Sequence, residues 1–236
     1  MEEWVSQLDV LSEIAKSEPQ AAYSGFTAGF KHKLTYFIRT MPDLVELLKP
    51  VDDIINNKLL PAITERFAIS DDDRRLFTLP AKMGGLGIPI FSEISPIEYN
   101  NSRRLTETLR GNIVAQERDY IIDEEGEKAK VRAQKKEKDE RNQNTIDDLR
   151  QRMTPEQIRA NDLAQLKGAS VWLTSLPLKC EGFSLNKRYF FDALALRYRW
   201  TLTLKYLPTH CHCGKPFTLH GPCHAMHAWG LRQPKT

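Results

Sequence analysis

Apolar residues recur at spacings of three and four along most of this 236-residue chain, and this spacing constrains the fold more than any other feature. Residues at such spacings share one side of an α-helix. The pattern is clear in residues 2–16 and 19–40, and again in residues 96–120 and 154–206. The sequence therefore predicts an all-α fold with few or no strands.

An almost entirely charged stretch divides this pattern. Residues 117–152 lose the apolar period, and such a stretch forms either a solvated single helix or a disordered linker. Its basic run could bind phosphate or act as a nuclear address, but interleaved acidic residues favour a solvated face with ion pairs four residues apart. That run consists of Lys128, Lys130, Arg132, Lys135, Lys136 and Lys138. Four segments are predicted: a helical unit at 1–116, the charged linker at 117–152, a second helical unit at 153–207, and a short Cys/His knuckle and tail at 208–236.

Local signals mark where several helices begin and end. Pro19 suits the first turn of a helix, because proline lacks the N–H that is unpaired there. Thr154, followed three residues later by Gln157, matches a capping box. Pro50 and Pro61 are expected to divide and stop two short helices.

Two features that resemble nucleotide chemistry have simpler explanations. Ser70 and the aspartates at 71–73 predict a helix cap, since adjacent side chains on a helix point about 100° apart and do not converge on one ion. Residues 79–89 contain three glycines but not the spacing of a phosphate-binding loop. We expect a tight turn with close backbone packing there. No catalytic residues are predicted.

The C-terminal tail concentrates potential zinc ligands. Three of the four cysteines and five of the six histidines lie in residues 210–227, where apolar residues are too few for a core. Zinc takes four nitrogen or sulfur ligands in a tetrahedron. A structural zinc site is therefore predicted from Cys211, Cys213 and Cys223, with His220, His224 or His227 as the fourth ligand; the alternative is an adventitious cluster.

Basic and aromatic residues alternate just before that tail, a pattern that suits phosphate contact and base stacking. Amphipathic core packing explains the same pattern about equally well. The net charge of +3 is mild for a nucleic-acid-binding protein, so the net charge alone does not indicate nucleic-acid binding and the placement of the charges must be considered. The candidate nucleic-acid-binding residues are Arg188, Arg197, Tyr198, Arg199, Trp200 and Lys205, with Lys31, Lys33 and Arg39 from the first unit.

The sequence also indicates a compartment. No apolar stretch approaches the ~20 residues that a membrane span requires. The start, Met1 to Trp4, is acidic where a signal peptide would be basic and then apolar. We therefore expect an intracellular protein of the nucleus or cytoplasm, with no membrane partner.

Six blocks together resemble the downstream part of an invertebrate retrotransposon reverse transcriptase polyprotein, and the likeness spans nearly the whole chain. GGLGI is widespread among elements without long terminal repeats, whereas the WLTSLPL and DALALRYRW blocks are narrower signals. The blocks are AKSEPQAAY (15–23), KLTYFIRT (33–40), LPAKMGGLGI (79–88), GASVWLTSLPL (168–178), DALALRYRW (192–200) and CHCGKPF (211–217).

The resemblance implies a helical thumb and connector, followed by a Cys/His knuckle. The family enzyme is an RNA-directed DNA polymerase, but residues 68–73 lack the aromatic-x-Asp-Asp motif of its palm, and the chain ends before a nuclease domain. We therefore expect a non-catalytic fragment that grips DNA or RNA, with the polymerase and nuclease portions of the polyprotein as missing partners. The alternative is a helical protein-interaction module with a degenerate Cys/His tail.

Overall fold

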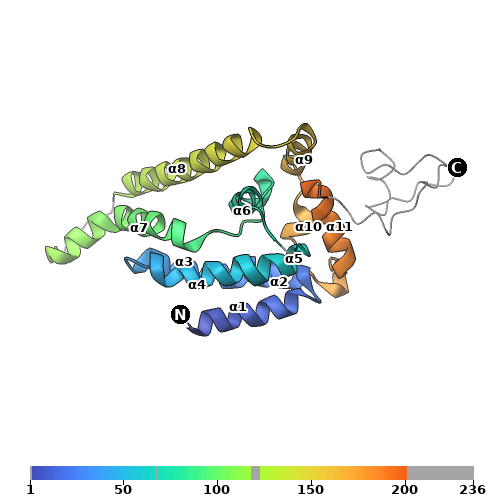
Figure 1. The fold of residues 1–236 in the computed structure, drawn as a ribbon. Helices are drawn as coiled ribbons and strands as arrows, with labels where there is room; N and C mark the ends of the chain where they lie inside the picture. The colour runs from blue at the N-terminus through green and yellow to red at the C-terminus, as the bar shows by residue number, and fades with distance from the viewer. Residues whose placement is uncertain (1, 67, 118–122, 201–236) are drawn as a thin grey trace, which may run out of the picture.

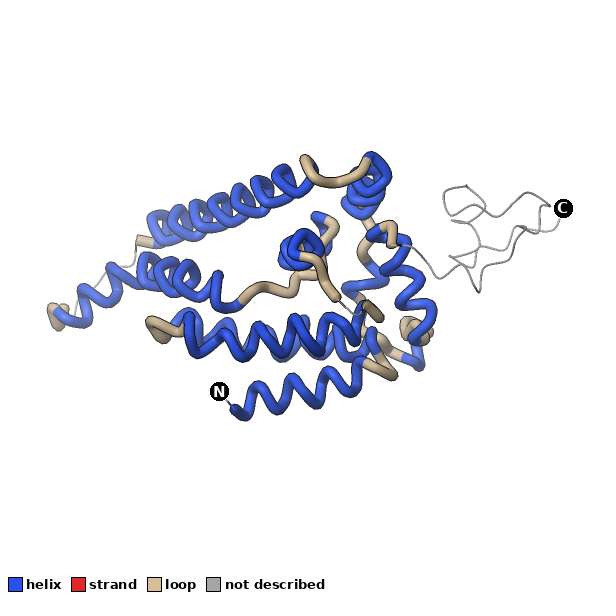
Figure 2. Tube along the Cα trace, in the orientation of Figure 1, coloured by secondary structure: helices blue, strands red, loops and turns tan. Residues whose placement is uncertain are grey.

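The computed structural model describes residues 2–66, 68–117 and 123–200. Every regular element in these ranges is a helix and none is a strand, which confirms the all-α prediction (Figure 2). In chain order the helices are α1 (Glu2–Ala15), α2 (Pro19–Gly25), α3 (Lys31–Thr40), α4 (Val45–Ile54), α5 (Leu60–Thr64), α6 (Asp71–Thr78), α7 (Phe91–Val114), α8 (Glu124–Arg150), α9 (Pro155–Gln165), α10 (Val171–Thr174) and α11 (Lys187–Tyr198).

Two of the long helices contain a π-helical turn. Phe26–Phe30 joins α2 to α3, and Ile55–Leu59 joins α4 to α5, so each pair forms one continuous helix. The prediction that Pro50 and Pro61 break helices is therefore wrong. Pro50 is exposed, so water can bond the carbonyl that it leaves unpaired, and the wide π turn directly precedes Pro61 and adjusts the hydrogen-bond register there.

The predicted helix caps are confirmed. The Ser70 hydroxyl accepts a hydrogen bond from the backbone N–H of Asp73 at 3.1 Å, at the start of α6. Thr154 and Gln157 form a reciprocal capping box at the start of α9. Each cap satisfies backbone donors that a helix leaves unpaired in its first turn.

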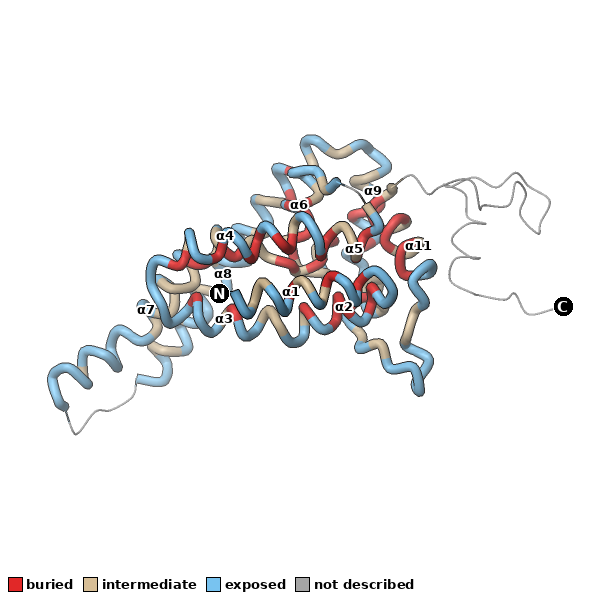
Figure 3. The backbone as a smooth tube through the Cα atoms, turned by 60° about the horizontal axis from the view of Figure 1, so that its bottom comes forward, coloured by how far each residue is buried: buried red, intermediate tan, exposed pale blue. Residues whose placement is uncertain are grey.

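The N-terminal helices form the lower layers of the molecule (Figure 1). α1 packs against α2, α4 and α5, while α3 and α4 both pack against α7. Large apolar side chains such as Leu8, Phe26, Leu34 and Phe91 are fully buried between them. Figure 3 shows that the buried positions continue from α4 and α5 into α11, whereas the far end of α7 is exposed.

The second predicted helical unit packs directly on the first. Phe190 of α11 is fully buried, with its ring centroid 6.4 Å from that of Tyr23 and 5.8 Å from that of Trp172. The Gln20 side chain accepts from the Leu185 N–H at 2.6 Å and donates to the carbonyl oxygen of Phe183 at 3.2 Å. Residues from both predicted units therefore belong to one hydrophobic core.

The glycine-containing segment at 79–89 is a tight turn, as predicted. Gly84 has a φ of 93°, in the left-handed region that favours glycine. A Cβ on Gly85 would lie 1.9 Å from the carbonyl oxygen of Leu79. The Tyr23 hydroxyl donates to the carbonyl oxygen of Leu86 at 2.8 Å, which joins this turn to α2.

A buried carboxylate and a buried guanidinium fix the start of α7. The two oxygens of Asp52 accept from the N–H groups of Phe91 and Ser92, both at 2.8 Å. Arg74 donates to the carbonyl oxygens of Ile88 and Pro89, both at 2.9 Å. These bonds hold the turn, α4 and α6 together at the first residues of α7.

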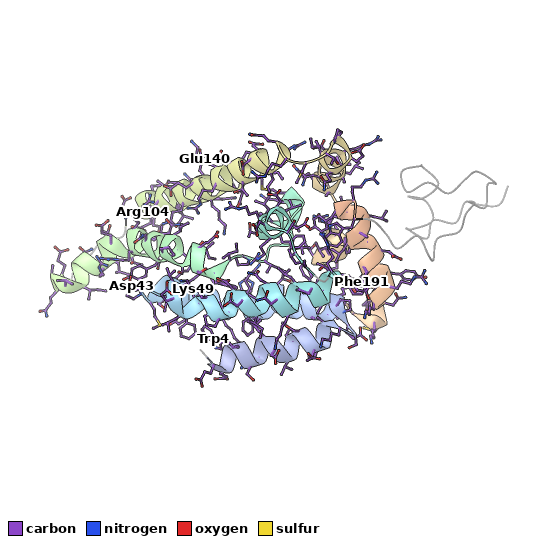
Figure 4. All side chains as sticks on the ribbon, in the orientation of Figure 1. Trp4, Asp43, Lys49, Arg104, Glu140 and Phe191 are labelled. Atoms are coloured by element: carbon purple, nitrogen blue, oxygen red, sulfur yellow. The ribbon has the colours of Figure 1, made fainter. Side chains whose placement is uncertain are left out.

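The charged segment at 117–152 is helical over α8, which runs beside α7 (Figure 1). Arg104 of α7 makes two hydrogen bonds to the Glu137 carboxylate, at 3.0 and 3.1 Å, and it lies between the two helices in Figure 4. The end of α8 is anchored in the body, where Ile146 and Leu149 are buried. None of the helices in the described ranges is both long and apolar enough to cross a membrane.

Candidate nucleic-acid interface

Two of the candidates on α11 are core residues. Arg197 is 8% exposed and donates to the carbonyl oxygen of Ala81 at 2.7 Å and to the Ser170 hydroxyl at 3.1 Å. Tyr198 is 6% exposed, and its ring packs edge-on against Phe77 at a centroid distance of 5.2 Å. The prediction that these two residues contact nucleic acid is therefore corrected: they take the alternative role in core packing.

Trp200 is also committed to contacts within the protein. Its ring stacks on Tyr198 at a centroid distance of 5.0 Å, and the Arg66 guanidinium lies 4.8 Å from its centroid. These neighbours occupy the ring that was predicted to stack on bases. Arg188 is exposed near the start of α11, and Arg199 follows α11 with a φ of 57°.

The candidates on α3 differ in their surroundings. Arg39 pairs with Glu98 of α7 at 3.0 Å, while Lys33 is exposed. Lys31 is partly buried, and its Nζ donates to the carbonyl oxygen of Gly87 at 3.3 Å. Burial lowers the pKa of Lys31, and the positive charge of Lys138 lowers that pKa further. The fold thus brings a lysine of α8 within electrostatic range of α3.

Lys138 is part of a basic row along α8. Lys128, Arg132, Lys135 and Lys138 are exposed and are spaced by four, three and three residues, so they share one side of the helix. The same row continues through Asn142 to the buried Ile146 and Leu149 at spacings of four, four and three. This side of α8 is therefore buried in the body at its C-terminal end and carries exposed cations along the preceding turns.

We define the α3–α8 basic surface as Lys31, Arg132, Lys135 and Lys138. None of these four side chains forms an ion pair with another residue of the described ranges. The nearby Glu137 pairs with Arg104, which lowers the pKa of Glu137, and Glu140 pairs with Lys136 at 3.7 Å. These two glutamates therefore pair with cations outside the α3–α8 basic surface and do not neutralise its charges.

Three members of this surface belong to the basic run that sequence reasoning interpreted as a solvated face. Their register with Ile146 and Leu149 is visible in the sequence, and it indicates that these cations lie on the side of α8 whose last apolar residues are buried. The effect of the Lys138 charge on Lys31 depends on how α8 packs, which no local sequence pattern contains.

The predicted zinc ligands Cys211, Cys213, His220, Cys223, His224 and His227 lie outside the described residues, as does Lys205. Within the described ranges no group of three His, Cys, Asp or Glu side chains could hold a metal ion. Cys180, the cysteine that these ranges contain, is exposed and free.

No family model, curated protein or solved structure matches this chain.

Proposed function

We propose that this chain binds nucleic acid through its phosphate groups, as a non-catalytic part of a retrotransposon reverse transcriptase polyprotein. The observation that carries the proposal is the row of exposed cations on one side of α8, namely Arg132, Lys135 and Lys138, none of which forms an ion pair within the described ranges. Like charges on one side of a helix repel one another, so an anion bound beside them is favoured. A phosphate group supplies that negative charge.

The shape of the α3–α8 basic surface suits a polyanion better than a single small ion. From Arg132 to Lys138 the row covers about 9 Å of helix at 1.5 Å per residue. Cations spread along a rigid helix can neutralise successive phosphates and release their counterions. Such contacts give affinity without reading the base sequence.

A second candidate function, protein interaction, is favoured by exposed apolar side chains at the end of α7. The residues Leu109, Ile113 and Val114 are 50%, 66% and 79% exposed. An apolar face at the end of a projecting helix is suited to docking a partner helix. This alternative needs no contribution from the α3–α8 basic surface.

Reversing two charges on α8 separates the two functions. We expect Lys135→Glu combined with Lys138→Glu to weaken binding of single-stranded, duplex and hybrid oligonucleotides alike, by about tenfold or more near 50 mM salt. Each lost duplex phosphate contact should also reduce the slope of log affinity against log salt by about 0.9. Fluorescence anisotropy with labelled oligonucleotides over a salt series measures both quantities.

Lys167→Glu is the matched control, because Lys167 is an exposed lysine outside this surface and its reversal changes the net charge in the same direction. It should alter affinity much less than a reversal on α8. If the folded chain binds no oligonucleotide near 50 mM salt, or binds with no salt dependence, the protein-interaction function becomes the better proposal.

We also propose that the tail binds one structural zinc ion through Cys211, Cys213 and Cys223 with one histidine. Replacing Cys211 or Cys223 by Ser removes a thiolate ligand and should lower the zinc content of the purified chain. Elemental analysis measures the metal, and Cys180→Ser is the control because the exposed Cys180 lies outside this cluster. A wild-type content well below one zinc per chain would contradict the proposal.

A further inference from the structure

Hydrogen bonds show which sides of α7 and α8 face each other. The two helices run in opposite directions (Figure 1), and three residue pairs join them by bonds of 2.7 to 3.1 Å. These bonds fix how each helix is rotated about its own axis relative to the other. The pairs are Asn101 with Gln134, Arg104 with Glu137, and Thr108 with Lys130.

The residues that directly follow these contact residues share one face of the helix pair. Each successive residue of an α-helix is turned by about 100° round the axis. Because both helices are right-handed and run antiparallel, this turn leads to the same face of the pair in α7 and in α8. We define the α7–α8 face as Leu105, Leu109 and Ile113 of α7 with Val131, Lys135 and Lys138 of α8.

The part of this face on α7 is an uncovered apolar stripe. Leu109 and Ile113 are exposed, and Leu105 is half-buried. At the start of α7 the same side of the helix buries Phe91 and Ser95, where α3 and α4 pack against it. The stripe is therefore the continuation of a core-forming side past the helices that cover its beginning.

The part of the face on α8 is mainly cationic. Lys135 and Lys138 are exposed and have no ion pair within the part of the chain that the structure describes, and the apolar Val131 lies beside them. Axes of packed helices are about 8 to 10 Å apart. A row of cations and an apolar stripe thus run side by side at about that separation.

We propose that the α7–α8 face binds single-stranded nucleic acid, with its phosphates on α8 and its bases on the apolar stripe of α7. The inference rests on the phosphate-binding function proposed above and names the class of its ligand. A single strand leaves the apolar faces of its bases in water, and these gain by contact with an apolar surface. A duplex keeps its bases stacked inside, so it uses the cations alone.

The chemistry of the face favours this ligand over a docked protein helix. An amphipathic helix lays its apolar side into a groove that is itself hydrophobic. Here Lys135 and Lys138 make the α8 side of the face cationic. Leucine and isoleucine, in contrast, do contact bases in proteins that unstack DNA.

Oligonucleotides with and without bases test the proposal on the full chain. Fluorescence anisotropy near 50 mM salt compares labelled oligothymidine, an abasic strand of equal length, and a duplex of equal length. Oligothymidine should bind about tenfold more tightly than the abasic strand, which has the same phosphates. Leu109→Ser combined with Ile113→Ser should remove this preference and leave the affinities for the abasic strand and the duplex unchanged. Lys135→Glu combined with Lys138→Glu should instead weaken binding of all three probes.

Val10→Ser combined with Ile14→Ser is the matched control for the apolar stripe. Val10 and Ile14 are also four residues apart on one helix, and their exposures of 59% and 45% resemble the 50% and 66% of Leu109 and Ile113. This control should bind all three probes like the wild type.

The outcomes separate the inference from the function on which it rests. Binding of none of the probes by the folded chain would overturn the phosphate-binding function and the inference together. Equal binding of oligothymidine and the abasic strand would overturn the inference alone, as would a preference that survives Leu109→Ser with Ile113→Ser. Weaker binding of the abasic strand by that double variant would also overturn it, because the two residues would then support the phosphate contacts.

Discussion

Replacing Gly85 by Ala is expected to destabilise the fold by more than about 4 kcal/mol, a large part of the roughly 5 to 15 kcal/mol that stabilises an ordinary protein. The added Cβ would lie 1.9 Å from the carbonyl oxygen of Leu79 and 2.6 Å from that of Leu76. Both are backbone atoms, so no side-chain rotation relieves the overlap. The turn would have to move, and with it the carbonyl oxygen that accepts from Tyr23. Urea denaturation followed by circular dichroism measures the loss.

The same substitution at Gly111 is the control. Gly111 lies in α7, and nothing is within 4 Å of the position that its Cβ would take. Gly111→Ala should therefore stabilise the helix by about 0.5 to 1 kcal/mol, because alanine loses less backbone entropy on folding. If the free energy of unfolding of Gly85→Ala lies within about 1 kcal/mol of the wild-type value, the turn adapts easily to a Cβ and its close packing does not stabilise the fold.

Asp52→Ala is expected to cost about 3 to 5 kcal/mol, as removal of a buried charged partner does. Asp52 is 5% exposed and accepts both of the first free N–H groups of α7. Its charge also compensates Arg74, whose pKa is lowered to about 10 by burial and raised in opposition by Asp52 and Glu93. The alanine chain would bury unpaired donors and a less compensated guanidinium.

Two further variants at this place sharpen the test of the Asp52 prediction. Asp52→Asn keeps one acceptor oxygen and should lose less stability than Asp52→Ala. Asp53→Ala removes a neighbouring, exposed carboxylate and should change stability by less than about 0.5 kcal/mol. Equal unfolding free energies for the variants at 52 and 53 would show that the carboxylate does not anchor α7.

The helices were predictable because their signals are local. The apolar period predicted α1, and hydroxyl or proline residues at the correct offsets predicted the starts of α2, α6 and α9. The continuation of two helices through Pro50 and Pro61 was not predictable in this way. It depends on exposure at one proline and on a π turn before the other, and both are properties of the folded chain.

The candidate sites were less predictable because they depend on contacts between distant segments. The alternation of basic and aromatic residues in α11 fits base stacking and core packing equally. Core packing is observed because Tyr198 packs on Phe77 and Arg197 donates to the carbonyl oxygen of Ala81, and both partners lie more than a hundred residues earlier in the chain. Charge composition left α8 as either helix or disordered linker. Its buried Ile146 and Leu149 anchor its C-terminal end in the body, and Glu137 joins it to Arg104 of α7.

The contact of α11 with α2 has a consequence for how the chain is made. Gln20 and its partner Leu185 are 165 positions apart, so a ribosome adding about 5 to 20 residues per second completes the first some ten to thirty seconds before the second. During that interval the side of Tyr23 that later contacts Phe190 has no cover. Until α11 is synthesised, the N-terminal helices of the nascent chain therefore expose apolar surface that α11 covers in the finished fold.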